Sequence, residues 1–105
     1  LAALIAHEAT HADFDYYPVF WEDTTLQRHP ELQRDQLHIQ VPPGNSLDQE
    51  YNAFCNGMKT WIELKGSNTN SFQDDWLAEY NQGEANMRAQ IKIAYIASGQ
   101  NLPDY

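Results

Sequence analysis

The stretch LIAHEATHA, residues 4–12, has the pattern of a helix that carries two histidines one turn apart. His7 and His11 are separated by four positions and Glu8 follows the first of them, so the motif is H-E-x-x-H. Residues at this spacing share one face of a helix. Apolar side chains lie on or beside the same face, and we therefore expect both histidines to project from a buried stripe. These apolar side chains are Leu1, Leu4, Ile5 and Ala12.

This spacing suits a zinc ion. The Cβ atoms of helical residues i and i+4 are about 5–6 Å apart, so the imidazoles of His7 and His11 can converge on one tetrahedral ion. Glu8 is rotated by roughly 100° from His7 and still borders that face. It is poorly placed to join the same chelate, but it can reach a water molecule on the metal, which is the position of a general base. The motif predicts zinc as cofactor, His7 and His11 as ligands and Glu8 as catalytic base.

The longer run HEATHADFDY, residues 7–16, resembles the active-site helix of the zincin metallopeptidases, especially the thermolysin-like form. In that form H-E-x-T-H-A is followed closely by an Asp-Tyr pair. The resemblance covers ten residues and implies a zinc peptidase that acts on peptide or protein substrates. It also implies a gluzincin arrangement, in which the third zinc ligand is a glutamate from a second helix downstream.

A second helix is predicted over residues 47–64, with Ser46 as N-cap and Gly66 as stop. At 100° per residue, Glu50 falls within about 40° of the centre of the apolar stripe, whereas Glu63 falls on the opposite face. A carboxylate among apolar side chains is costly unless it is paired or binds a metal. We therefore expect Glu50 to be the third zinc ligand. The stripe consists of Leu47, Tyr51, Phe54, Met58, Trp61 and Ile62.

A third helix is predicted over residues 72–98. Glu84 lies about 60° from the centre of its apolar stripe, so it is the alternative third ligand. We favour a salt bridge from Glu84 to Arg88 over a metal role. The N-cap candidates are Asn70 and Ser71, and the stop signal is Gly99.

The segment between the first two helices is predicted to be a loop of about thirty residues that packs over the zinc cleft. Residues 36–41 alternate between apolar and polar and can form one short strand, which residues 42–45 (PPGN) close as a turn. Zincins commonly use a Tyr or His to donate a hydrogen bond to the developing oxyanion. His38 and Tyr16 are our candidates for this role, and Tyr17 and His29 are further options.

Partners for the second nitrogen of the zinc-bound imidazoles are predicted close to the motif. Such a nitrogen usually donates to a carboxylate or carbonyl group, which fixes the tautomer of the ring. Asp13 and Asp15 are near His11 in sequence, and Asn52 lies close to Glu50. The sequence leaves these alternatives open.

Length and charge limit the function further. The 105 residues suit a single domain, residues 1–105, that is mainly α or α+β at most. There is little room before the motif for the sheet that aligns substrates in zincins, so we expect an N-terminally truncated or minimal member, completed by a further segment or a partner chain.

The formal charge of −9 argues against nucleic-acid binding. No apolar run reaches the length of a membrane span. Cys55 has no second cysteine to pair with and is expected to be a buried thiol.

The leading hypothesis is thus a zinc-dependent metallopeptidase of the gluzincin type. His7, His11 and Glu50 hold the metal, Glu8 is the general base, and water is the nucleophile. An alternative is a non-catalytic zinc-binding domain, in which the metal joins the first two helices. A third hypothesis is a metal-free helical interaction module with a coincidental motif.

Overall fold

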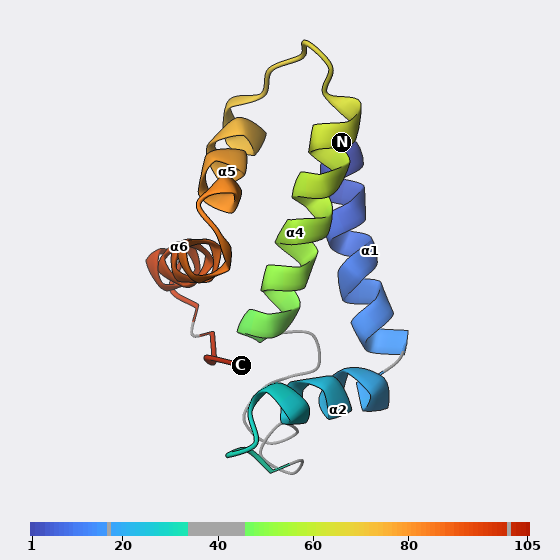
Figure 1. Cartoon of the computed structure of the whole chain (residues 1–105), viewed down its shortest axis with the longest axis vertical. Coiled ribbons are helices and arrows are strands. Elements are labelled where there is room, and N and C mark those ends of the chain that lie inside the picture. The colour runs from blue at the N-terminus through green and yellow to red at the C-terminus, as the bar shows by residue number, and fades with distance from the viewer. Residues whose placement is uncertain (17, 34–45, 101) are drawn as a thin grey trace.

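The computed structural model describes residues 1–16, 18–33, 46–100 and 102–105. Within these ranges the chain is helical and contains no strand, which confirms the prediction of a mainly α protein. Figure 1 shows α1 and α4 side by side, with α2 across one end of the pair and α5 and α6 on the opposite side of α4. The helices are α1 (Ala2–Tyr16), α2 (Pro18–Arg28), α4 (Leu47–Leu64), α5 (Ser71–Asn81) and α6 (Glu84–Ala97).

Helix α4 is the central element, and its limits are those that the sequence predicts. The Ser46 side chain accepts a hydrogen bond from the backbone N–H of Gln49 and so caps the N-terminus. The helix ends at Leu64, just before Gly66, whose φ of 54° is a backbone conformation that favours glycine. Helices α4, α5 and α6 enclose the main core. Its buried members are Leu47, Met58, Met87, Ile91 and Leu102.

Helix α1 packs very closely against α4. A Cβ atom built on Gly57 of α4 would lie 3.1 Å from the backbone oxygen of Ala3 and 3.8 Å from the Cβ of His7. The helix axes can approach this far because small residues face each other at the contact. Further along α1, Asn56 donates a 2.8 Å hydrogen bond to the hydroxyl of Thr10. The position of the two histidines therefore depends on this tight contact.

The predicted apolar stripe on the motif helix is wrong. Leu4 and Ile5 are 53% and 59% exposed, and Leu1 and Ala12 are exposed as well. Small residues such as Ala3 occupy the contact with α4 instead, and the larger apolar side chains would have held the two helices further apart. The histidines thus lie at the edge of the helix contact and not within a broad apolar stripe.

The prediction of a single helix over residues 72–98 is also wrong. The structure has two helices there, α5 and α6. The break lies at Gly83, which has a φ of 104° that side-chain-bearing residues rarely adopt. The expected end signals are correct: Asn70 caps α5 by accepting a hydrogen bond from the N–H of Gln73, and Gly99, with a φ of 82°, follows α6. The change of direction lets both helices pack against α4 (Figure 1).

The long loop predicted after the motif helix begins later than expected. Residues 18–28 form α2, which starts with a proline at the first helical position, where its fixed φ suits a helix and no N–H is needed. Arg28 in the last turn favours the same helix. The predicted strand at 36–41 and turn at 42–45 lie outside the described residues, as do Tyr17 and His38.

The C-terminal residues fold back onto the start of α4. The backbone N–H of Leu47 donates to the carbonyl of Pro103, and Tyr105 packs against Leu26 and Leu32. These contacts bring the end of the chain next to the α2 region (Figure 1). Among the helices that the structure describes, none combines the length and apolar character needed to cross a membrane.

Candidate metal centre

Three side chains from α1 and α4 converge on one point. The Nε2 atoms of His7 and His11 are 3.2 Å apart. Oε2 of Glu50 lies 3.4 Å from Nε2 of His7, and Oε1 of Glu50 lies 3.1 Å from Nε2 of His11. In the described part of the chain this is the group of His, Cys, Asp and Glu side chains arranged to hold a metal ion. The structure therefore brings together the three residues that the sequence singles out as ligands.

Local sequence explains why these side chains meet. His7 and His11 are one turn apart on α1. Glu50 lies in the first turn of α4, which Ser46 caps, and it points into the contact between the two helices. Only 4% of Glu50 is exposed, in agreement with the predicted inward orientation, whereas Glu63 is exposed.

The Glu50 carboxylate is ionised despite its burial. Burial opposes its ionisation, but a hydrogen bond from His11 and the nearby imidazole of His7, with a smaller effect of Tyr95, outweigh this effect and lower its pKa to about 2. The same hydrogen bond to Glu50 raises the pKa of His11, against the opposing effect of burial. The cluster is therefore a negatively charged acceptor that attracts a cation, either a proton on His11 or a metal ion.

The donor set fits zinc. Ligands at about 2.0–2.1 Å from a tetrahedral ion are roughly 3.3–3.4 Å from one another, and the three separations at His7, His11 and Glu50, 3.1 to 3.4 Å, are close to this value. Two imidazoles and one carboxylate are also a known combination for catalytic zinc. In addition, buried Oε2 of Glu50 has no hydrogen-bond partner of good geometry among the described residues. A metal ion would satisfy that oxygen.

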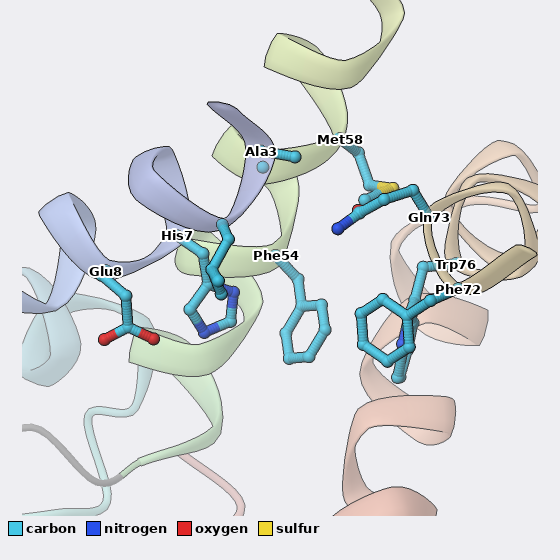
Figure 2. Close-up of a pocket in the computed structure, with 10 residues that line it drawn as sticks. Ala3, His7, Glu8, Phe54, Met58, Phe72, Gln73 and Trp76 are labelled. Carbon is cyan, nitrogen blue, oxygen red and sulfur yellow. The ribbon is translucent and has the colours of Figure 1, made fainter. Parts of the chain in front are cut away.

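Glu8 lies at the exposed border of the cluster. It follows His7 on α1, its side chain is solvent-accessible, and its charge raises the pKa values of His11 and Tyr95. Figure 2 shows its carboxylate on the side of His7 away from Phe54. Glu8 is therefore near the cluster without being one of its three converging donors.

Sequence reasoning missed two residues at this site. Burial, together with a hydrogen bond between the Tyr95 hydroxyl and Glu50, raises the pKa of Tyr95. Gln49 is 1% exposed and directly precedes Glu50, and neither polar atom of its side-chain amide has a hydrogen-bond partner among the described residues. In the sequence, Tyr95 is recognisable only as part of the apolar stripe of the third predicted helix. Gln49 could have been found from its position beside Glu50 in a buried first turn.

The other candidates have different surroundings. Tyr16, at the end of α1, is 82% exposed, so its proposed catalytic role has no support from contacts here. Glu84 forms the expected salt bridge, with its Oε1 3.2 Å from Nε of Arg88, and it also pairs with Arg28 at 3.0 Å. Nothing is described for His38.

The side chains considered as partners for the imidazoles bind elsewhere. Asp13 accepts a 3.0 Å hydrogen bond from the indole of Trp21 and so joins α1 to α2. Asn52 donates to the backbone carbonyl of Asp48 within α4. His29, which was a candidate donor to the oxyanion and not an imidazole partner, lies 3.2 Å from the buried carboxylate of Asp48. The side chain of Asp15 is outside the described set.

An apolar cleft of about 190 Å³ adjoins the cluster. His7 forms part of its wall, and the ring of Phe54 packs edge-on against His7 with centroids 4.6 Å apart. Trp76 of α5 continues this row, 4.5 Å from Phe54 (Figure 2). The complete lining is Ala3, Leu4, His7, Glu8, Phe54, Gly57, Met58, Phe72, Gln73 and Trp76.

Comparison with protein-family models, curated proteins and solved structures found no match to this chain. The residues of the cluster and the cleft are therefore the features from which a function can be inferred.

Proposed function

We propose that this chain is a zinc-dependent metallopeptidase domain of the gluzincin type. The observation that carries the proposal is the convergence of His7, His11 and Glu50, whose donor atoms are 3.1 to 3.4 Å apart. Three protein ligands are the number that catalytic zinc sites use, leaving one position for water or substrate. The side chains of both histidines are partly exposed, at 17% and 20%, which is consistent with access from solvent.

Each residue of the site would have a separate role in the reaction. His7, His11 and Glu50 would hold the ion. When bound, zinc supplies a Lewis acid that polarises the substrate carbonyl and makes water more acidic. The Glu8 carboxylate, exposed beside His7, would accept the proton of the attacking water and pass it to the leaving amine.

The experiment that tests this function compares Glu8→Gln with the wild type, both loaded with zinc and incubated with a mixture of unstructured peptides. Mass spectrometry of the mixture should show cleavage by the wild type and a loss of at least about 100-fold in Glu8→Gln, the range expected for removal of a general base. Both proteins should retain zinc.

Glu63→Gln is the matched control, because Glu63 is exposed on the far face of α4. It should cleave at the wild-type rate. Equal cleavage by wild type and Glu8→Gln would contradict the proposed role of Glu8. Absence of cleavage by zinc-loaded wild type would contradict the peptidase function.

A second function, a non-catalytic zinc-stabilised domain, is favoured by one observation. The contact of α1 with α4 uses small residues such as Ala3 and Gly57, while Leu4 and Ile5 remain exposed. Zinc bound between the helices would thus stabilise this contact. In that case added zinc should raise the melting temperature of wild type and Glu8→Gln equally, with no cleavage by either protein.

A further inference from the structure

The first turn of α4 is held from two sides through two carboxylates. Asp48 and Glu50 are two positions apart, which places their side chains about 200° apart around the helix. Glu50 points to the histidines of α1, whereas Oδ1 of Asp48 lies 2.7 Å from Nη1 of Arg88 on α6. Figure 1 shows α4 between these two helices. A movement of this turn relative to α6 would therefore also move Glu50 relative to α1.

The end of a helix needs more support than its centre. The first N–H groups have no partner within the helix, and helix ends open more easily than helix centres. In α4 the N–H of Gln49 donates to the Ser46 hydroxyl, and the N–H of Leu47 donates to a carbonyl of the C-terminal segment. A metal ligand must keep its place to within about 0.5 Å. Side-chain contacts from neighbouring helices therefore matter for the placement of Glu50.

Arg88 contacts residues on both sides of Glu50 in the sequence. Besides its ion pair with Asp48, its guanidinium lies over the ring of Tyr51, 4.6 Å from the ring centroid. Nε of Arg88 lies 3.2 Å from Oε1 of Glu84, which orients the guanidinium plane. The side chains of Arg88 and Asp48 are 17% and 5% exposed, so solvent and salt weaken their ion pair little. Charge, hydrogen-bond geometry and stacking therefore act together on this turn.

The ion pairs extend from Arg88 to the end of α2. Nη2 of Arg28, in the last turn of α2, lies 3.0 Å from the same oxygen of Glu84 that meets Arg88. His29, just after that helix, places its Nε2 3.2 Å from Oδ2 of Asp48. Both carboxylates that bind Arg88 are thus restrained by α2 as well. The guanidinium therefore has partners whose positions are already fixed.

Stability alone explains this network poorly. Taking two charges out of water costs free energy, and a buried ion pair can often be replaced by apolar side chains without loss of stability. A guanidinium with three defined contacts supplies something that an apolar side chain does not, namely a fixed distance and direction between two helices. The network is better explained by the geometry that it imposes on the first turn of α4.

We propose that Arg88 is a positioning residue for the metal centre, because its contacts with Asp48 and Tyr51 hold the first turn of α4. The Glu50 carboxylate is thereby kept at the distance from the two histidines that a metal ion needs. Arg88 acts through these neighbours and is not itself a ligand. The inference rests on the metal centre of the proposed function and not on the peptidase reaction.

The experiment compares the zinc affinities of the full-chain wild type, Arg88→Met and Arg88→Lys, measured at neutral pH by competition with a zinc-binding dye. Arg88→Met removes all three contacts and should bind zinc at least about tenfold more weakly, as expected for loss of a residue that supports a metal ligand. Arg88→Lys keeps the charge, but one ammonium group cannot reproduce the planar, several-armed contacts of arginine. It should show most of the same loss. Full recovery of affinity by lysine would mean that charge alone matters and would overturn the inference.

Cobalt-loaded protein gives a readout that general destabilisation does not change. Cobalt(II) in a tetrahedral site absorbs strongly in the visible range, so loss of one ligand alters the spectrum. The spectrum of Arg88→Met should differ from that of the wild type. Leu77→Ala, which shortens a side chain packed against the core from α5, should lower the melting temperature but keep the wild-type spectrum and zinc affinity. A wild-type spectrum in Arg88→Met would overturn the inference.

A double variant addresses the possibility that Arg88→Met does not fold. Asp48→Asn combined with Arg88→Met leaves neither partner of the ion pair charged, so no buried charge loses its partner at this position. This variant should fold, as circular dichroism would show, and should still bind zinc at least about tenfold more weakly than the wild type. Wild-type zinc affinity in the folded double variant would overturn the inference.

The outcomes separate this inference from the proposed function. Weaker zinc binding by the Arg88 variants, without peptide cleavage by the wild type, would support the inference and count against the peptidase function. Cleavage by the wild type, with unchanged zinc affinity in the Arg88 variants, would overturn the inference and leave the peptidase function in place. Absence of zinc from the wild type would contradict both.

Discussion

Nε2 of His11 lies 3.1 Å from Oε1 of Glu50, a contact that joins the motif helix to the first turn of α4. The two residues shift each other's pKa in opposite directions: that of Glu50 falls to about 2, and that of His11 rises. A bound metal would replace the proton that His11 holds in this pair.

The first prediction concerns the pH dependence of stability without metal. Glu50 has a lowered pKa in the folded state, so its contribution is present above its ordinary pKa of 4.5 and is lost as the pH falls toward 2. His11 has a raised pKa, so its contribution is present below 6.5 and is lost as the pH rises through the raised value. The pair therefore stabilises the fold most between about pH 4.5 and 6.5.

Urea unfolding of metal-free wild type and Glu50→Gln checks this prediction. The difference between their free energies of unfolding should be greatest near pH 5.5 and smaller at pH 3 and pH 9. A difference that stays constant with pH would show that the two groups do not titrate as a pair.

The second prediction tests the close contact of α1 with α4. Replacing Gly57 by leucine should force the helices apart, because even a Cβ at this position would lie 3.1 Å from the backbone oxygen of Ala3. Zinc affinity should fall at least about tenfold, although Gly57 is not a ligand, since His7 and His11 would move away from Glu50. Helix content should be retained, because leucine favours helix more than glycine does.

Competition with a zinc-binding dye measures the affinity. Ala89→Leu, at an exposed position of α6, is the control and should bind zinc as the wild type does. Unchanged affinity in Gly57→Leu would mean that the distance between the two helices does not determine the site.

The third prediction concerns the buried carboxylate of Asp48, two positions before Glu50. Asp48 lies 2.7 Å from Arg88 and 3.2 Å from His29, and its side chain is 5% exposed. Asp48→Asn would leave Arg88 buried without this partner. The free energy of unfolding should fall by about 2 kcal/mol, less than for a fully buried pair because Arg88 also bonds to Glu84.

Chemical denaturation at neutral pH gives the magnitude. Asp75→Asn, on the exposed side of α5, should change the stability by less than about 0.5 kcal/mol. Combining Asp48→Asn with Arg88→Met should cost less than the sum of the single changes. Additive effects would contradict a direct coupling of the two charges.

Much of the convergence of His7, His11 and Glu50 could be predicted because it depends on short-range rules. The spacing of His7 and His11 places them on one face of a helix, and the helical period places Glu50 toward the core. The N-cap residue Ser46 defines the start of α4 and therefore places Glu50 in its first turn.

Other features depend on tertiary packing and could not be predicted from the sequence. The outward position of Leu4 follows from the small residue Gly57 on another helix. The approach of Tyr95 to Glu50 depends on the change of direction at Gly83. A glycine within an otherwise periodic helical pattern is compatible with either one helix or two, and packing against α4 decides between them.

The most direct test of the central claim is the zinc content of the chain after dialysis against metal-free buffer at neutral pH, measured by native mass spectrometry. The wild type, Glu8→Gln and Glu84→Gln should each retain about one zinc ion. Glu50→Gln should retain little, because only His7 and His11 would remain as ligands. Absence of zinc from the wild type, or equal zinc in Glu50→Gln and Glu84→Gln, would contradict the proposed metal centre.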